Sequence, residues 1–109
     1  MNRIHLMGML PLCLTAVAAT AADAGAGRAK AESVCQTCHG VDGQATQAMV
    51  PHLSGQQQDY LVIQLEAYRS GQRQHPQMSI IAQMLSDEDI RNLAAWYASI
   101  PIKVELPGQ

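Results

Sequence analysis

Apolar residues recur at helical spacing in the middle of the chain and predict an amphipathic helix there. Between residues 59 and 70, Leu61, Leu65 and Tyr68 stand four and three positions apart, so they share one face of a helix. Gly71 follows directly and supplies a stop signal, because glycine readily adopts the left-handed conformation that ends a helix. We expect the apolar face of this helix to lie against the protein interior.

A second amphipathic helix is predicted after Leu85. The segment 86–89 resembles an N-terminal capping box, and its carboxylates lie in the first turn, where the helix dipole favours negative charge. Pro101 ends the helix. The apolar stripe of this helix consists of Ile90, Leu93, Ala94 and Tyr97. Helix physics therefore explains the acidic start without a partner-docking role.

The remaining segments complete an all-α prediction of about four short helices. Residues 24–34 form a first helix, residues 40–58 form a loop rich in turn residues, and Met84 lies in a short helical turn. The chain after Pro101 is expected to be a loosely held tail, and no segment shows the alternation of a strand. The apolar positions of the first helix are expected to be Ala26, Ala29, Ala31 and Val34.

The first residues have the three regions of a secretory leader. Arg3 supplies a positive start, residues 6–19 form an uncharged apolar stretch, and residues 19–21 offer a small-x-small cleavage site. We predict residues 1–22 to be a cleaved signal peptide and residues 23–109 to be one periplasmic domain. An uncleaved membrane anchor is the alternative, but the apolar run is weak for spanning a bilayer.

Composition narrows the class of protein and exposes a deficit in its core. The chain has 109 residues and a formal net charge of −2, which argues against a nucleic-acid binder. Hydrophobic residues make up 48% and charged residues 15%, so a disordered tail is excluded. Only 4% of the residues are aromatic, and a domain of this size has a marginal apolar core. We expect something besides side chains to complete the core.

A single motif supplies that missing component. Without Cys13, which lies in the leader, the cysteines are Cys35 and Cys38, and His39 follows at once. Two residues between the cysteines and an adjacent histidine is the spacing for c-type haem attachment. Each thiol adds to one haem vinyl group as a thioether, and the imidazole then lies over the iron. The sequence therefore predicts one covalently bound haem c.

Other uses of these residues are less favourable. A disulfide between Cys35 and Cys38 would close too short a loop to stabilise much, and a thioredoxin-like redox pair belongs to a βαβ pattern. A zinc site needs a second ligand pair at short spacing, whereas His52 and His75 are single. Either histidine could also give a bis-histidine haem, although each is more typical of a solvated loop.

The sixth ligand of a haem iron held by His39 is expected to be a methionine, because His/Met ligation suits electron transfer. Met49 is too near the attachment motif in sequence. Met78 lies in an irregular segment, where Pro76 blocks a continuing helix and the backbone can turn a side chain inward. Met84 is more typical of a core methionine. Met78 is therefore our expected ligand, with Met84 as the alternative.

Several segments together resemble class I cytochrome c of the short bacterial type, and are similar to one half of the dihaem tandem cytochromes. The resemblance covers roughly residues 24–100. It is carried by the segments 35–40 (CQTCHG), 50–56 (VPHLSGQ), 60–68, 85–90 (LSDEDI) and 96–98 (WYA).

The resemblance implies an all-α fold in which the first and last helices cross around one haem c. It implies His39 as the proximal iron ligand and Met78 as the distal ligand. It also implies that the Pro51 carbonyl accepts the other ring N–H of His39, which fixes the imidazole. Relatives usually carry an aromatic residue where this chain has Ala31, so the helix crossing is expected to be less filled unless Trp96 or Tyr97 leans across.

The function implied is a one-electron carrier rather than an enzyme, with a redox protein as donor and another as acceptor. A carrier of this kind acts as a monomer or in transient complexes and meets membranes only through its partners. One alternative is a haem-bearing subunit of a larger dehydrogenase or oxidase. Another is a haem enzyme or sensor with an open distal face, which requires Met78 not to be bound. A single attachment motif excludes a dihaem arrangement within this chain.

Overall fold

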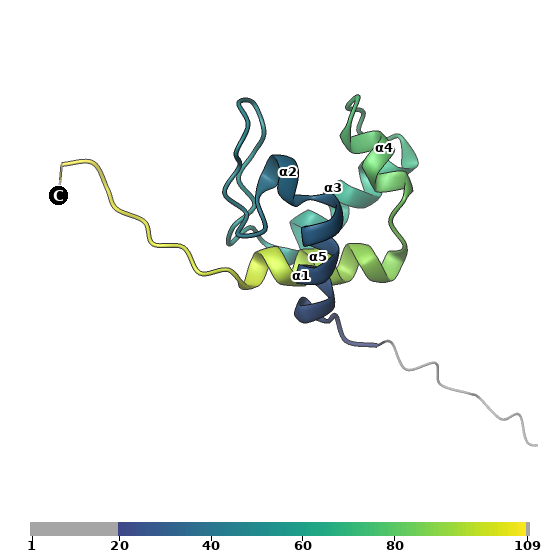
Figure 1. Ribbon diagram of the computed structural model, residues 1–109, viewed down its shortest axis with the longest axis horizontal. Helices are drawn as coiled ribbons and strands as arrows, with labels where there is room; N and C mark the ends of the chain where they lie inside the picture. The colour runs from purple at the N-terminus through teal and green to yellow at the C-terminus, as the bar shows by residue number, and fades with distance from the viewer. Residues whose placement is uncertain (1–19, 109) are drawn as a thin grey trace, which may run out of the picture.

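The computed structural model describes residues 20–108, and these form an all-helical domain without strands (Figure 1). The helices are α1 (Ala24–Val34), α2 (Gln36–His39), α3 (Gln58–Ser70), α4 (Met78–Gln83) and α5 (Asp87–Ser99). The predicted fold class is thus confirmed. The described part contains five helices rather than about four, because the attachment motif itself forms the short helix α2. The predicted leader lies almost entirely outside the described residues and stays a prediction.

Helices α1 and α5 cross, and their contact is the most extensive between any two helices (Figure 1). Gly27 makes the close approach possible, because a Cβ atom added there would stand 1.9 Å from the carbonyl oxygen of Asn92. Ala31 is fully buried one turn later. The Asn92 side chain accepts the Asp23 N–H at 2.8 Å and so ties the start of α1 to α5.

The expected apolar face of the first helix is therefore partly wrong. Ala26 and Ala29 are exposed, and the buried positions are Gly27 and Ala31. Small residues line this face because the backbone of α5 takes the space that larger side chains would need. The sequence predicts a crossing that is less filled at Ala31 unless Trp96 or Tyr97 leans across, and the structure places Ala31 and Tyr97 in one buried cluster with Trp96 packed against it.

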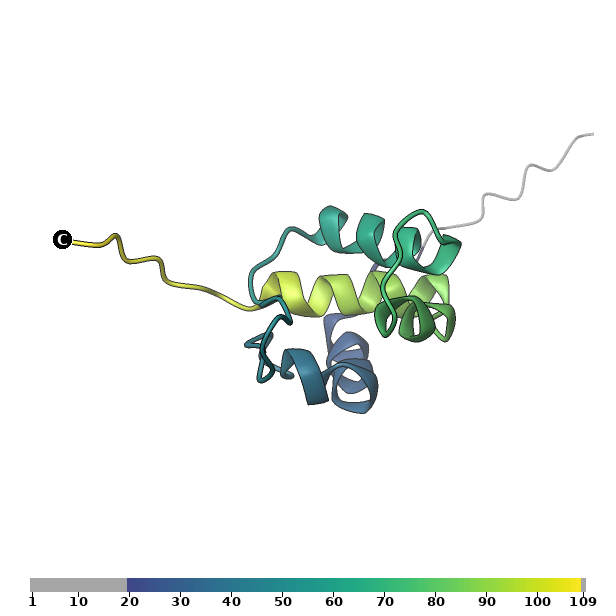
Figure 2. The ribbon, with the colours of Figure 1, turned by 90° about the horizontal axis from the view of Figure 1, so that it is seen from above.

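Helix α5 is the central element of the domain. Figure 2 shows it between α1 on one side and α3 on the other, with α4 near its N-terminal end. Its start is a capping box, since Ser86 Oγ accepts the Asp89 N–H at 3.0 Å and the Asp89 carboxylate accepts the Ser86 N–H at 3.1 Å. Lys30 of α1 pairs with Asp89 at 3.2 Å. The predicted capping role of this acidic segment is confirmed.

The hydrophobic core of the described residues is small. Ile90 is its largest side chain that is less than 2% exposed. Several apolar side chains of the same size or larger are exposed to solvent, among them Tyr60, Ile63 and Ile80. The buried hydrophobic residues are Ala31, Leu61, Ala82, Leu85, Ile90, Leu93, Ala94 and Tyr97. Such a core matches the expectation that side chains alone do not complete the interior.

The ends of the described chain add little to this core. After Pro101 the chain forms no further helix, and every residue to Gly108 is exposed (Figure 1). Among the helices of the described residues, none is long and apolar enough to cross a membrane.

Candidate functional site

The attachment motif lies at the junction of α1 and α2. Cys35 ends α1 and donates its N–H to the Ala31 carbonyl at 2.9 Å, and the His39 N–H then bonds the Cys35 carbonyl at 2.9 Å. This single turn of helix places Cys35 and Cys38 three positions apart, so their side chains lie on one face. Both cysteines carry free thiols. The geometry presents two unpaired thiols and an imidazole along one short stretch of backbone.

The His39 ring is held by the loop that follows α2. His39 is only 8% exposed, and its Nδ1 atom lies 2.9 Å from the carbonyl oxygen of Pro51. Because a carbonyl can only accept, Nδ1 carries the proton and donates. Nε2 is then the nitrogen with a free lone pair for a metal ion. The structure thus contains the hydrogen bond that the family resemblance implies for Pro51.

Two aromatic residues of α5 hold the turn that leaves the motif. The Tyr97 hydroxyl donates to the Gly40 carbonyl at 2.9 Å, and Trp96 Nε1 donates to the Val41 carbonyl at 2.8 Å. Burial raises the pKa of Tyr97, so its hydroxyl stays a neutral donor. The apolar stripe predicted from the sequence includes Tyr97 but gives no indication of these bonds. The only signal was the polar tip of each aromatic side chain, which needs a partner when buried.

The environment of Cys35 argues against a reactive redox thiol. Burial raises the pKa of the Cys35 thiol to about 11, although a hydrogen bond with Tyr97 and the charge of Lys30 act in the opposite direction. Reactive thiols have lowered pKa values, because the thiolate is the attacking species. The described residues also contain no strand to build a βαβ unit. A thioredoxin-like role is therefore unsupported.

The candidate distal ligands lie at the two ends of α4. Met78 is the first residue of that helix and is half-buried, so it does not lie in an irregular segment as the sequence suggested. Pro76 stands just before the helix, where its missing N–H costs nothing. Met84 is 60% exposed, so the expectation of a core methionine at this position is wrong. The buried residue of α4 is Ala82, whereas Met84, which caps the C-terminal end of the helix, faces solvent.

The other candidate ligands are exposed and do not gather around one metal site. Met49 is fully exposed, and His52 and His75 are exposed loop residues whose Nδ1 atoms accept backbone N–H groups. No group of three or more histidine, cysteine, aspartate or glutamate side chains within residues 20–108 could hold a metal ion. The zinc alternative therefore has no ligand set in this part of the chain.

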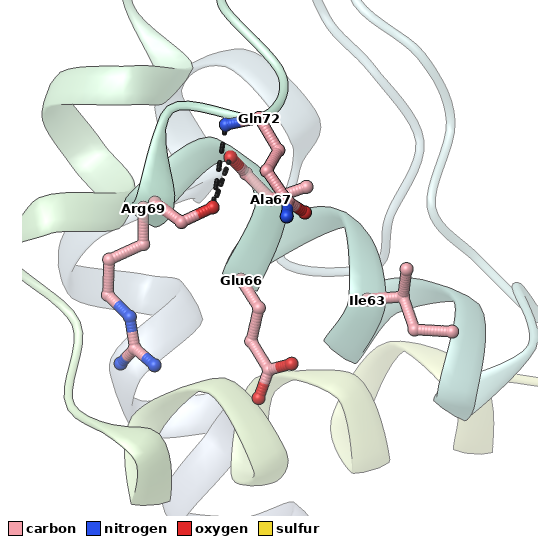
Figure 3. A pocket seen from close by; sticks show the side chains of 6 residues that line it. Ile63, Glu66, Ala67, Arg69 and Gln72 are labelled. Carbon is pink, nitrogen blue, oxygen red and sulfur yellow. Dashed lines mark hydrogen bonds between the residues drawn. The ribbon is translucent and has the colours of Figure 1, made fainter.

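An open hollow on the outer side of α3 is separate from the motif. Figure 3 shows the side chains that border it. The Ser70 hydroxyl donates to the Ala67 carbonyl at 3.2 Å. None of the predicted site residues borders this hollow. Its lining consists of Ile63, Glu66, Ala67, Arg69, Ser70 and Gln72.

The described residues fit a c-type haem in three respects. Two free thiols stand at the required spacing, a nearly buried imidazole leaves Nε2 for the iron, and the side chains form only a thin core. A thioether and an imidazole together form a ligand set suited to haem iron. Cys35, Cys38 and His39 would hold the group on one side, and Met78 is the half-buried methionine that could complete it.

Comparison with known proteins supports the same assignment. The Cytochrome c family model matches residues 24–101. Cytochrome c4 of Pseudomonas aeruginosa is 39% identical over 104 residues, which cover 95% of this chain and 51% of that protein. Cytochrome c-554(548) of Halomonas halodenitrificans is 46% identical over 82 residues, which cover 72% of this chain and 98% of that protein.

Structural similarity extends to a solved relative. The reduced recombinant cytochrome c4 from Pseudomonas stutzeri aligns with a TM-score of 0.68 and 36% sequence identity over 74% of this chain and 47% of that one. The chain therefore spans about half the length of the cytochromes c4 that it matches, and nearly all of cytochrome c-554(548). From its motif, its helical fold and these similarities, the chain belongs to the cytochrome c family, whose members carry covalently attached haem.

Proposed function

We propose that this protein is a periplasmic one-electron carrier that uses one haem c with His39 and Met78 as axial ligands. The observation that carries the proposal is the bond between His39 Nδ1 and the Pro51 carbonyl at 2.9 Å next to two free thiols. This arrangement leaves Nε2 free to bind the iron of the group that Cys35 and Cys38 would hold. When bound, the haem supplies an iron that cycles between the ferrous and ferric states.

The residues around the motif favour transfer without rearrangement. Pro51 keeps the imidazole of His39 in one tautomer and one orientation. Tyr97 and Trp96 fix the carbonyls of the turn after the motif, so the imidazole cannot shift easily. No proton has to move at these groups during electron transfer. A protein that only exchanges electrons needs a rigid setting of this kind.

Attachment is tested by replacing the two cysteines. In the protein expressed with export, we expect the mass of one haem to be added and to stay with the polypeptide after denaturation. Cys35→Ala combined with Cys38→Ala should abolish covalent attachment and leave little folded protein, because the core is thin. A cooperative melt of this haem-free variant equal to the wild type would count against the role of haem in the core.

The carrier function itself is tested by electrochemistry. Film or solution voltammetry of the wild type should give one reversible one-electron wave without a change of spin state. A ferric wild-type protein that is high-spin and binds cyanide at once would instead support an enzyme or sensor with an open distal face. The voltammetry, the spin state and cyanide binding can all be measured on one preparation of the protein.

A free carrier and a dedicated subunit differ in whether the protein stays bound to one redox partner. Size-exclusion analysis of native periplasmic and membrane fractions should find the protein as a small species if it diffuses freely. Stable co-migration with a dehydrogenase or oxidase would favour the subunit instead. The redox partners on the donor and acceptor sides are proteins in both cases.

A further inference from the structure

His75 accepts two backbone N–H groups at the turn that leads into α4. Its Nδ1 atom lies 3.2 Å from Gln77 N and 3.3 Å from Met78 N. The His75 carbonyl also accepts the Ser79 N–H at 3.0 Å, which is the first bond of helical spacing in this segment. His75 therefore caps the turn of residues 75–79 that leads into α4, whose own N-cap residue, Gln77, makes no side-chain cap bond. Pro76 takes the position after His75, where proline is favoured.

A second bond runs in the opposite direction and closes the cap. The His75 N–H donates to Ser79 Oγ at 3.0 Å. His75 and Ser79 are thus joined by two hydrogen bonds, in the manner of a capping box extended by one residue. Nδ1 accepts from backbone donors, so the ring proton is on Nε2. The imidazole here accepts the backbone N–H groups that a serine, threonine, aspartate or asparagine side chain usually accepts at the start of a helix.

This cap matters because α4 is short and packs mainly on one side, against α3. Helix α4 has 6 residues, and Ala82 is its only fully buried member. Ile80 and Met84 are 65% and 60% exposed. Isolated helices of this length are unstable in water, so α4 depends on its packing against α3 and on the hydrogen bonds at its ends. Met78 lies in the capped turn and takes its backbone position from it.

We propose that His75 is a positioning residue for Met78, and that its Nδ1 holds the Met78 amide so that the thioether stays at the haem iron. The inference rests on the proposed ligand role of Met78. It gives His75 a task that is neither that of an iron ligand nor that of a merely solvated loop residue. Loss of the His75 side chain would keep Met78 in place in the sequence but would allow the turn that carries Met78 to open.

The test uses the haem-loaded protein and exogenous imidazole as a competitor for the iron. His75→Ala removes the cap, and His75→Asn restores an acceptor that suits an N-cap. We expect His75→Ala to bind imidazole about fivefold more tightly than the wild type, a change typical of a lost cap. His75→Asn should stay within about twofold of the wild type. Hydrogen exchange at the Met78 amide should speed up in His75→Ala only.

His52 offers a matched control. It is also exposed, and its Nδ1 accepts the Ala45 N–H at 2.8 Å, but it lies in the loop on the His39 side. We expect His52→Ala to leave imidazole affinity and exchange at Met78 unchanged. Ser79→Ala, which removes only the reciprocal bond, should give a smaller increase than His75→Ala and serves if that variant folds poorly.

The outcomes separate this inference from the proposed function. Absence of a sulfur-to-iron charge-transfer band in the ferric wild type would refute the ligand role of Met78 itself. If the band is present and His75→Ala binds imidazole as the wild type does, the positioning role is overturned. It is also overturned if His75→Asn is as impaired as His75→Ala, since capping would then not explain the effect.

Discussion

Replacement of Gly27 by alanine tests how the α1–α5 crossing depends on a missing side chain. The new Cβ would stand 1.9 Å from the Asn92 carbonyl oxygen and 2.5 Å from its carbonyl carbon. To reach the 3.0 Å that real contacts respect, the two helices must separate by about 1 Å. Backbone atoms cannot swing aside as a side chain can, so the strain falls on the whole crossing.

The magnitude follows from two opposing effects. Alanine favours a helix over glycine by up to about 1 kcal/mol. Forcing extra volume into a packed contact costs about 1–3 kcal/mol and sometimes more, and a backbone clash belongs at the upper end. We expect Gly27→Ala to lower the free energy of unfolding by about 2 kcal/mol, which lowers Tm by roughly 10 °C in a domain of this size.

Gly25 provides the control in the same helix. A Cβ added there would meet only the Asp23 carboxylate at 3.2 Å, at an exposed position. Gly25→Ala should leave stability unchanged or raise it by up to about 0.5 kcal/mol. Urea unfolding of the haem-loaded proteins, followed by circular dichroism, gives both values. Equal stability of Gly27→Ala and the wild type would refute the account of the crossing.

Two further predictions concern α5. Tyr97→Phe keeps the ring but leaves the Gly40 carbonyl without its donor, so thermal melts should show a loss of about 1–2 kcal/mol; an unchanged melt would show that water replaces the hydroxyl. Partial burial alone would raise the pKa of Asp89, but its bonds with Ser86 and the charge of Lys30 outweigh that and lower it. A carboxylate with a lowered folded-state pKa stabilises fully above its unfolded value of about 3.9, and that contribution is lost as the pH falls through the folded value. Asp89→Asn should therefore be less stable than the wild type at neutral pH, and urea titrations should show the gap narrowing in acid; a gap independent of pH would contradict this.

The sequence predicted the parts of the fold that depend on local signals. The bounds of α1 and the capping box of α5 agree with the structure, because a capping pattern and a helix stop act over a few residues. The attachment motif is also local, since its chemistry needs fixed spacing between Cys35, Cys38 and His39. Such features need no knowledge of distant contacts.

The incorrect or missing predictions concern side chains whose surroundings are set by elements distant in sequence. The buried face of α1 follows Gly27 and Ala31 rather than its larger apolar residues, because Asn92 of α5 lies against it. Met84 is exposed because the packing of α4 on its neighbours turns Ala82 inward. The bonds from Trp96 and Tyr97 to the turn after the motif span more than 50 residues of sequence, at separations of 55 and 57. No periodicity within one helix reports such contacts.

The ferric absorption spectrum of the purified haem-loaded protein tests the central claim most directly. We predict a low-spin wild type with a sulfur-to-iron charge-transfer band at long wavelength. That band should vanish in Met78→Ala and persist in Met84→Ala, whose methionine is largely exposed. A band that survives in Met78→Ala and is lost in Met84→Ala, or a high-spin wild type, would contradict the proposed ligation and with it the carrier function.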